Sequence, residues 1–167
     1  MIPKITTTQL PTESKCSNYI TNIDFQDAYA VALSDAGISI QNIYLNIFAH
    51  SPNWVNGLLR LRNNIVGLFG LDTYKNSSEI STNNLKVGSK TGIFKIYAIS
   101  DNEIIAGEDD KHLDFRVSVV KQNKKVIIST LVHYNNNFGR AYMTLIMPFH
   151  KMVVKAMLKN ALKNNRL

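Results

Sequence analysis

The sequence predicts an α+β domain in which an antiparallel sheet wraps around a long C-terminal helix, with two short helices after the first strand. Apolar and polar residues alternate over residues 113–119, as the two faces of a strand require. A helical pattern of apolar residues runs almost without interruption over residues 138–162. Strands joined by short turns form a meander, whose apolar face must be buried against such a helix.

The composition fits one folded domain. A chain of 167 residues with 45 % hydrophobic and 19 % charged residues is typical of a single globular core. We expect a polar N-terminal arm over residues 1–22 and a single domain over residues 23–167. The net charge of +7 is compatible with nucleic acid, anionic lipid or an acidic ligand, and it does not choose among them.

The single cysteine, Cys16, excludes an intrachain disulfide and a thiolate zinc cluster. The N-terminus lacks the apolar stretch of a signal peptide, and no apolar run approaches the roughly 20 residues needed to span a bilayer. We therefore expect a cytoplasmic protein without a membrane span. The sequence indicates no oligomeric state.

The first half of the chain predicts one strand followed by two helices. The strand covers residues 23–33, and Ser39 is a suitable N-cap for a helix over residues 40–48. Ser51 and Pro52 have the order expected at the start of the second helix. Its apolar face and its end consist of Trp54, Leu58, Leu61, Ile65, Leu68 and Gly70.

The middle of the chain predicts a loop and then a meander. Residues 72–90 are polar and suit a surface loop, either a lid or simply a variable segment, with a short edge strand near Leu85 and Val87. The remaining strands are expected at residues 92–99, 104–106, 113–119 and 126–134. With the first strand, this makes about five clear strands. The last helix contains Pro148, which predicts a kink.

Three segments of the chain resemble a mostly bacterial family of unknown function of the DUF2867 type: SPNWVNGLLRLRN, GEDDKHLDFRVSV and FGRAYMTLIMPFHKMVVKAMLK. That family is grouped with the START-like, or SRPBCC helix-grip, superfamily, whose members wrap a sheet around a C-terminal helix and often enclose an apolar cavity. The resemblance covers residues 23–162 and implies this fold, but no catalytic residues. The superfamily usually has six or seven strands, so the loop at residues 72–90 must contain a strand or the sheet is smaller.

Our first hypothesis is a module that binds a small apolar or aromatic ligand between the sheet and the C-terminal helix. The faces expected to look inward are rich in aromatic and aliphatic side chains, and two tyrosines could add polar anchors. The residues we expect in the cavity wall are Phe115, Val117, Val132, Tyr134, Tyr142, Leu145, Ile146, Phe149 and Val153.

A second hypothesis is a small enzyme, of the cyclase, dehydratase or hydrolase type, working in the same cavity. Its candidate residues are His112, Asp114, His133 and Tyr142, and His150 is a further histidine that could reach the cavity. This hypothesis requires the side chains to converge.

The charged residues around Glu108, Asp110, His112 and Asp114 have a spacing suited to a metal or an acid/base pair. The same residues are typical of a hairpin turn followed by a polar sheet face, and we favour this interpretation. No HExxH, paired-cysteine, GxGxxG or Walker motif occurs, so the sequence predicts neither a metal site nor a cofactor.

A third, weaker hypothesis is a protein or membrane-surface adaptor that uses a basic stripe on the last helix, formed by Lys151, Lys155, Lys159 and Lys163. A solvated helix face, whose cations suit the helix C-terminus, also explains the stripe, and we favour this interpretation. The stripe lacks interleaved aromatic residues, so nucleic acid is not an expected partner.

Overall fold

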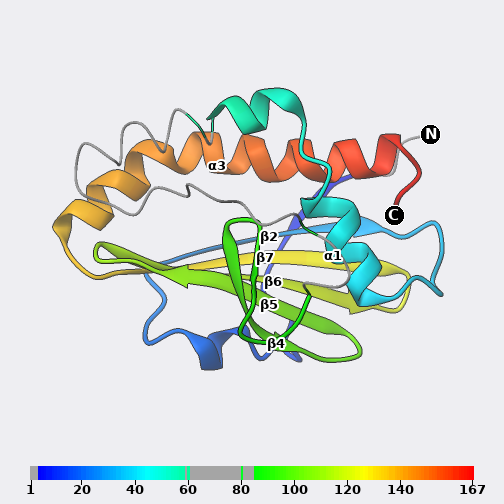
Figure 1. Ribbon diagram of the computed structural model, residues 1–167, viewed down its shortest axis with the longest axis horizontal. Helices are drawn as coiled ribbons and strands as arrows, with labels where there is room; N and C mark the ends of the chain where they lie inside the picture. Colours follow the sequence, from blue (N-terminus) through cyan, green and yellow to red (C-terminus); the bar gives the residue numbers. More distant parts are fainter. Residues whose placement is uncertain (1–3, 59, 61–79, 81–84) are drawn as a thin grey trace.

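Seven antiparallel strands form one sheet in the order β1-β2-β7-β6-β5-β4-β3, and one long helix lies along it (Figure 1). The computed structural model describes residues 4–58, 60, 80 and 85–167. Its elements are β1 (Thr6–Thr8), η1 (Cys16–Tyr19), β2 (Phe25–Ala32), α1 (Ile40–Phe48), β3 (Lys90–Thr91), β4 (Phe94–Ile99), β5 (Glu103–Asp109), β6 (Leu113–Gln122), β7 (Lys125–Tyr134) and α3 (Asn137–Lys163).

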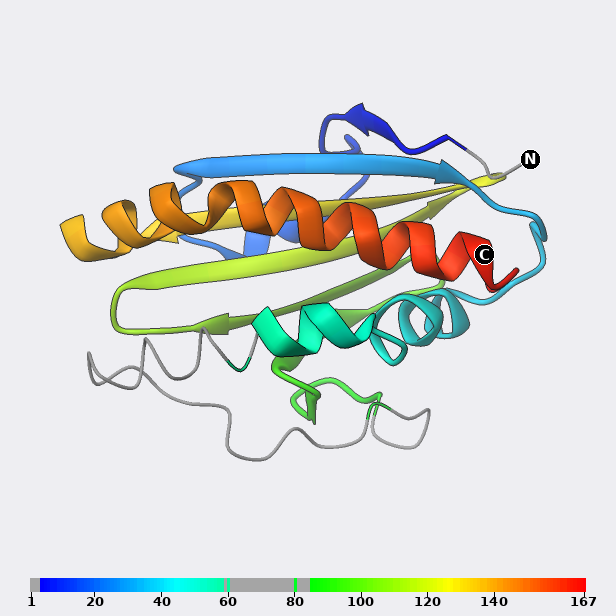
Figure 2. The ribbon, with the colours of Figure 1, turned by 90° about the horizontal axis from the view of Figure 1, so that it is seen from above.

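The predicted fold class is confirmed. The sheet is antiparallel, two short helices follow β2, and α3 contacts both the sheet and α1. Figure 2 shows α3 lying across the sheet, with α1 beside the C-terminal part of α3. The order of elements is therefore the one that the resemblance implied.

The two strands beyond the five expected are short edge strands. β1 has three residues, all exposed, so it carries no apolar alternation that a sequence pattern could reveal. The edge strand expected near Leu85 and Val87 was placed wrongly, because the strand lies at Lys90–Thr91 instead. Residues 85–89 form a turn in which the backbone of Gly88 has a φ of 85°.

The inward face of the sheet carries the main core. Period-two alternation puts Tyr29 and Val31 of β2 on the same face as Val117 and Val119 of β6, as predicted. The apolar face of α1 covers this layer with side chains that are almost completely buried: Ile40, Ile43, Tyr44 and Ile47. The hydroxyl oxygen of Ser39 accepts a hydrogen bond from the backbone N–H of Asn42, which confirms the predicted N-cap.

The second helix begins at residue 53, one residue later than expected, and residues 53–58 are helical. Val55 is buried there, whereas Trp54 is 44 % exposed. The predicted continuation through Leu61, Ile65, Leu68 and Gly70 lies outside the described residues, as does most of the loop predicted over residues 72–90.

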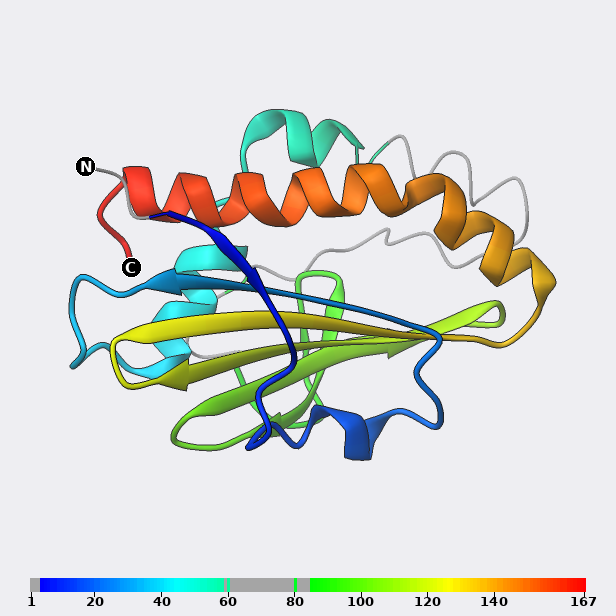
Figure 3. The ribbon, with the colours of Figure 1, turned by 180° about the vertical axis from the view of Figure 1, so that it is seen from behind.

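Asn136 is the N-cap of α3, and its side-chain oxygen accepts a hydrogen bond from the backbone N–H of Gly139. The helix continues through Pro148, which lacks the N–H that would donate to the carbonyl of Thr144. Figure 3 shows the golden first turns of α3 running at an angle to the rest of the helix.

The N-terminal segment, residues 10–20, packs on the outer face of the sheet, opposite to the face that carries the main core. η1 lies on one side of the sheet and α3 on the other (Figure 1). Cys16 is fully buried against Ile105 and Leu131, although it belongs to the segment predicted as a polar arm. The carboxylate of Glu103 holds this segment: it accepts hydrogen bonds from the hydroxyls of Ser14 and Ser118, at 2.5 and 2.6 Å, and from the backbone N–H of Lys15, at 2.9 Å.

Candidate functional site

A cavity of about 480 Å³ lies between the inward face of the sheet and α3. Each strand contributes every second residue, because successive side chains of a strand point to opposite faces of the sheet. α3 contributes residues that recur every three or four positions. α1 and residues 53–58 also contribute side chains to the wall. The described wall consists of Ile47, Phe48, Val55, Leu58, Ile93, Phe94, Leu113, Phe115, Val117, Ile128, Thr130, Val132, Tyr142, Met143, Leu145, Ile146, Phe149, His150, Val153, Val154 and Met157.

Eight of the nine side chains predicted for the cavity lie on this wall, and Tyr134 does not. Tyr134 pairs with Leu113 at the end of β7, and the guanidinium carbon of Arg140 lies 5.8 Å from its ring. Two wall residues on α3 also reach the surface, since Leu145 is 70 % and Phe149 is 50 % exposed. The wall is therefore partly accessible from the helix side.

One end of the cavity is polar. Nε2 of His150 lies 3.3 Å from Oδ1 of Asp27 in hydrogen-bonding geometry. It lies 3.2 Å from Oδ2 but outside that geometry, so Oδ2 is buried without a hydrogen-bond donor. Burial, reinforced by the Asp27 carboxylate, raises the pKa of the neighbouring Tyr29 to about 12. Thr130 of β7 is the direct cross-strand neighbour of Asp27 and lies on the cavity wall.

Sequence reasoning missed Asp27. The inward stripe of the first strand was recognised from its apolar members, and Asp27 has the same parity as Phe25 and Tyr29. An acidic residue on an otherwise apolar strand face is itself a signal, because burying a carboxylate costs free energy unless it has a partner. The partner, His150, is 123 residues away in the sequence.

The candidate catalytic residues do not converge. Tyr142 lies on the cavity wall. His133 and Asp114 alternate with wall residues of their strands, so they lie on the outer face of the sheet, where they are cross-strand neighbours. Nδ1 of His133 lies 2.8 Å from Oδ2 of Asp24. A hydrogen bond from the backbone N–H of Tyr134, followed by the contact with His133, lowers the pKa of Asp24. The structure thus separates the groups that the enzyme hypothesis needs together.

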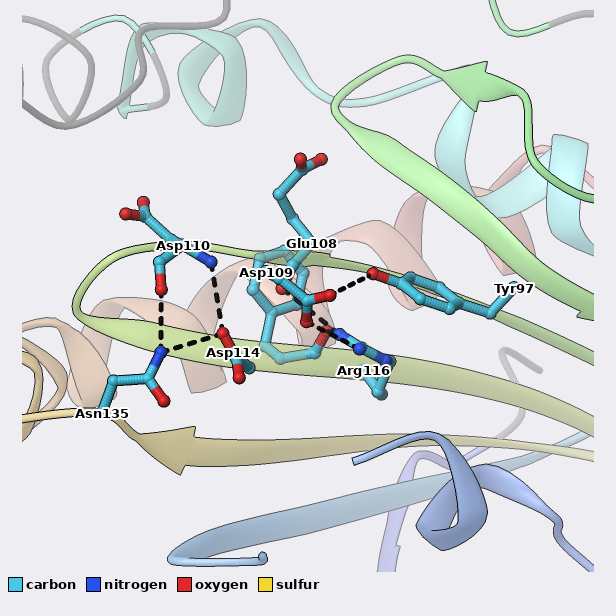
Figure 4. Close-up of polar contacts among 8 residues, drawn as sticks. Tyr97, Glu108, Asp109, Asp110, Asp114, Arg116 and Asn135 are labelled. Carbon is cyan, nitrogen blue, oxygen red and sulfur yellow. Dashed lines mark hydrogen bonds and ion pairs between the residues drawn. The ribbon is translucent and has the colours of Figure 1, made fainter. Parts of the chain in front are cut away.

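The charged residues at positions 108–114 lie at the turn of the β5–β6 hairpin, where they have a structural role. Figure 4 shows Asp110, Asp114 and Asn135 linked at the tip, while the side chain of Glu108 points away from them. The side-chain amide of Asn135 donates to the carbonyl oxygen of Asp110, at 2.8 Å, and to Oδ1 of Asp114, at 3.0 Å. Nδ1 of His112 lies 3.1 Å from the side-chain oxygen of Asn136, the N-cap of α3. Within the described ranges, no three His, Cys, Asp or Glu side chains are placed to hold a metal ion.

A second network lies beside this hairpin on the outer face (Figure 4). The buried guanidinium of Arg116 donates to Oδ1 of Asp109 at 2.7 Å, and its Cζ lies 3.9 Å from the ring centroid of Tyr97. The hydroxyl of Tyr97 donates to the other oxygen of Asp109 at 3.0 Å. These contacts join β4, β5 and β6 next to the turn of the β5–β6 hairpin, which is a structural role.

The four lysines of the basic stripe are exposed on α3, as both interpretations of the stripe require. Nζ of Lys155 lies 5.5 Å from the ring of Tyr29. No helix in the described part of the chain has the length and apolar character that crossing a bilayer demands.

Comparison with known proteins decides the family. Residues 19–157 match the family described as Protein of unknown function (DUF2867). The chain belongs to this family. The matched span contains only the last residue of η1, Tyr19, together with the strands from β2 to β7 and α3 as far as Met157, so it includes the whole described cavity wall.

The other comparisons add no function. No curated protein matches the chain. Among solved structures, it is similar to PA94 from Pseudomonas aeruginosa, a protein of unknown function, with 13 % identity and a TM-score of 0.25 over 91 % of this chain and 80 % of that chain. A likeness of that size carries no argument about the DUF2867 site.

Proposed function

We propose that this member of the DUF2867 family binds a small, largely apolar molecule in the cavity between the sheet and α3. The observation that carries the proposal is the cavity itself: about 480 Å³ of space with an almost entirely apolar wall. Protein interiors are normally close-packed, and a large void forfeits dispersion contacts along its whole lining. Ligand sites, in contrast, typically have volumes of about 300–1,000 Å³ and a few polar groups among apolar ones.

The composition of the wall favours an apolar body in the ligand. The sheet contributes the aromatic rings of Phe94 and Phe115, whose centroids lie 5.7 Å apart. α3 contributes the ring of Phe149. Methionine side chains adapt to irregular shapes, and Met143 and Met157 both lie on the wall. A ring system or a short alkyl chain would bury its surface against these groups at about 25 cal/mol per Å².

Titration with a neutral apolar fluorophore, N-phenyl-1-naphthylamine, tests the proposal. The probe should bind the wild-type protein with one-to-one stoichiometry and gain fluorescence. Val132→Phe places a larger side chain into the cavity and should weaken binding at least about tenfold, while Val87→Phe makes the same change at a 62 % exposed turn residue and should leave binding unchanged.

The two variants separate the proposal from nonspecific adsorption. Thermal unfolding of both variants shows whether they are folded, so a loss of binding can be read as a filled cavity. Absence of saturable binding to the wild type, or equal binding by Val132→Phe and the wild type, would overturn the proposal.

A further inference from the structure

We infer that the cavity selects an apolar molecule carrying a neutral hydroxyl group, and that His150 and Thr130 bind that hydroxyl. This inference rests on the proposed function, because it concerns the polar end of the same cavity. Both side chains lie on the wall, and both adjoin Asp27: Thr130 as its cross-strand neighbour and His150 through the contact of Nε2 with the carboxylate. Directly paired residues on one sheet face have Cβ atoms about 4.5–5.5 Å apart.

Two polar atoms at this end have no hydrogen-bond partner among the described residues: Nδ1 of His150 and the hydroxyl of Thr130. Thr130 is only 5 % exposed. Buried polar groups are normally hydrogen-bonded, so an unpaired hydroxyl and an unpaired ring nitrogen on the cavity wall favour a ligand that can hydrogen-bond.

Asp27 determines which hydrogen bonds the imidazole of His150 can make with a ligand. Its side chain is 9 % exposed, and its carboxylate can only accept hydrogen bonds from the neighbouring imidazole. In the neutral form of the ring, Nε2 of His150 donates to this carboxylate, and Nδ1 is left as an acceptor. The hydroxyl of Thr130 rotates and can donate. A ligand hydroxyl fits both, because it donates to Nδ1 and accepts from Thr130.

Charged head groups fit less well. The described cavity wall contains no Asp, Glu, Lys or Arg, so a ligand carboxylate or ammonium would lose its hydration without gaining an ionic partner in contact. The neutral hydroxyl is the head group that leaves no charge unpaired.

Displacement of bound N-phenyl-1-naphthylamine by three compounds of equal chain length tests the inference. We expect 1-decanol to displace the probe at concentrations about tenfold lower than decanoate or decylamine. Equal potency of the three, or stronger displacement by either charged compound, would overturn the inference. The proposed function would survive that result, since it depends only on binding of the probe itself.

Two variants locate the effect. Thr130→Val keeps the shape of the side chain and removes the hydroxyl, so it should weaken 1-decanol about threefold to tenfold more than it changes the affinity for the probe, measured in the same variant. Thr8→Val on the exposed strand β1 is the matched control and should change neither. A Thr130→Val variant that binds 1-decanol as the wild type does would contradict the assignment.

Asp27 is a positioning residue, and its test is spectroscopic. In the ¹⁵N spectrum of the imidazole of His150, the neutral ring of the wild-type protein should carry its proton on Nε2 and show Nδ1 as the unprotonated nitrogen. Asp27→Asn should shift the tautomer toward a protonated Nδ1, because an amide can donate to Nε2. An unchanged tautomer in Asp27→Asn, or a protonated Nδ1 in the wild type, would overturn this role.

Discussion

Gly139 in the first turn of α3 meets the carbonyl oxygen of His112 at the tip of the β5–β6 hairpin. A Cβ atom at Gly139 would collide with that backbone oxygen, so only glycine allows this approach. His112 also contacts the N-cap residue Asn136, and its carbonyl accepts a hydrogen bond from the backbone N–H of Asn135. The hairpin thus fixes where α3 begins, and with it the position of the helix over the cavity.

Gly139→Ala should therefore destabilise the protein by about 1–3 kcal/mol, because the helix start or the hairpin must move. Gly57→Ala is the matched control: Gly57 is helical, and a Cβ atom there meets nothing within 4 Å. That variant should gain about 0.5–1 kcal/mol, since alanine has the higher helix propensity. Chemical denaturation measures both, and a neutral Gly139→Ala would contradict the close approach.

Glu103 should be the main anchor of the N-terminal segment. Its buried carboxylate accepts three hydrogen bonds, and Glu103→Ala leaves the hydroxyl of Ser118 and the N–H of Lys15 without this partner. We expect a loss of about 2–4 kcal/mol. Glu13→Ala removes an exposed carboxylate that accepts from Gln122, and should change stability by less than about 0.5 kcal/mol. Equal effects of the two substitutions would argue against the anchor.

The thiol of Cys16 should be unreactive in the folded protein. It is fully buried, and burial, followed by the nearby Glu103 carboxylate, raises its pKa from 9.0 to about 12. A thiol reagent at pH 8 should label the wild type only after unfolding, whereas Glu103→Ala should label faster because the covering segment detaches. Rapid labelling of the native wild type would refute this packing.

The same thiol predicts a pH dependence. Its folded pKa lies above its unfolded value, so the unfolded state loses the proton first as pH rises. The contribution to stability is complete below about pH 9 and decreases by up to about 1.4 kcal/mol per pH unit between pH 9 and 12. Denaturation of wild type and Cys16→Ala across this range should show their difference in unfolding free energy changing by this slope, and parallel curves would exclude it.

Most of the fold could be predicted from the sequence because its signals are local. Alternation in β6, the capping Ser39 and the apolar stripe of α1 each lie within a few residues of one another. The short strands β1 and β3 gave no such signal, since strands of three and two residues are too short to show a period. They belong to the sheet through pairing with β2 and β4, which only the tertiary structure provides.

The candidate site was predictable in its apolar part and not in its polar part. Phe115, Val117 and Phe149 follow from the inward faces of a strand and a helix. The pairing of Asp27 with His150 joins residues 123 apart in the sequence, and no local pattern encodes it. His133 and Tyr134 illustrate the same limit, because a register shift of one residue would exchange their faces.

The most direct test of a ligand in this cavity is a methyl NMR titration of the wild-type protein with N-phenyl-1-naphthylamine. The methyl signals of Val117, Val132 and Ile128 on the cavity wall should shift in a saturable manner, while those of Ile105 and Leu131 on the outer face should stay in place. Shifts confined to the outer-face methyls, or no shifts at probe saturation, would contradict the account.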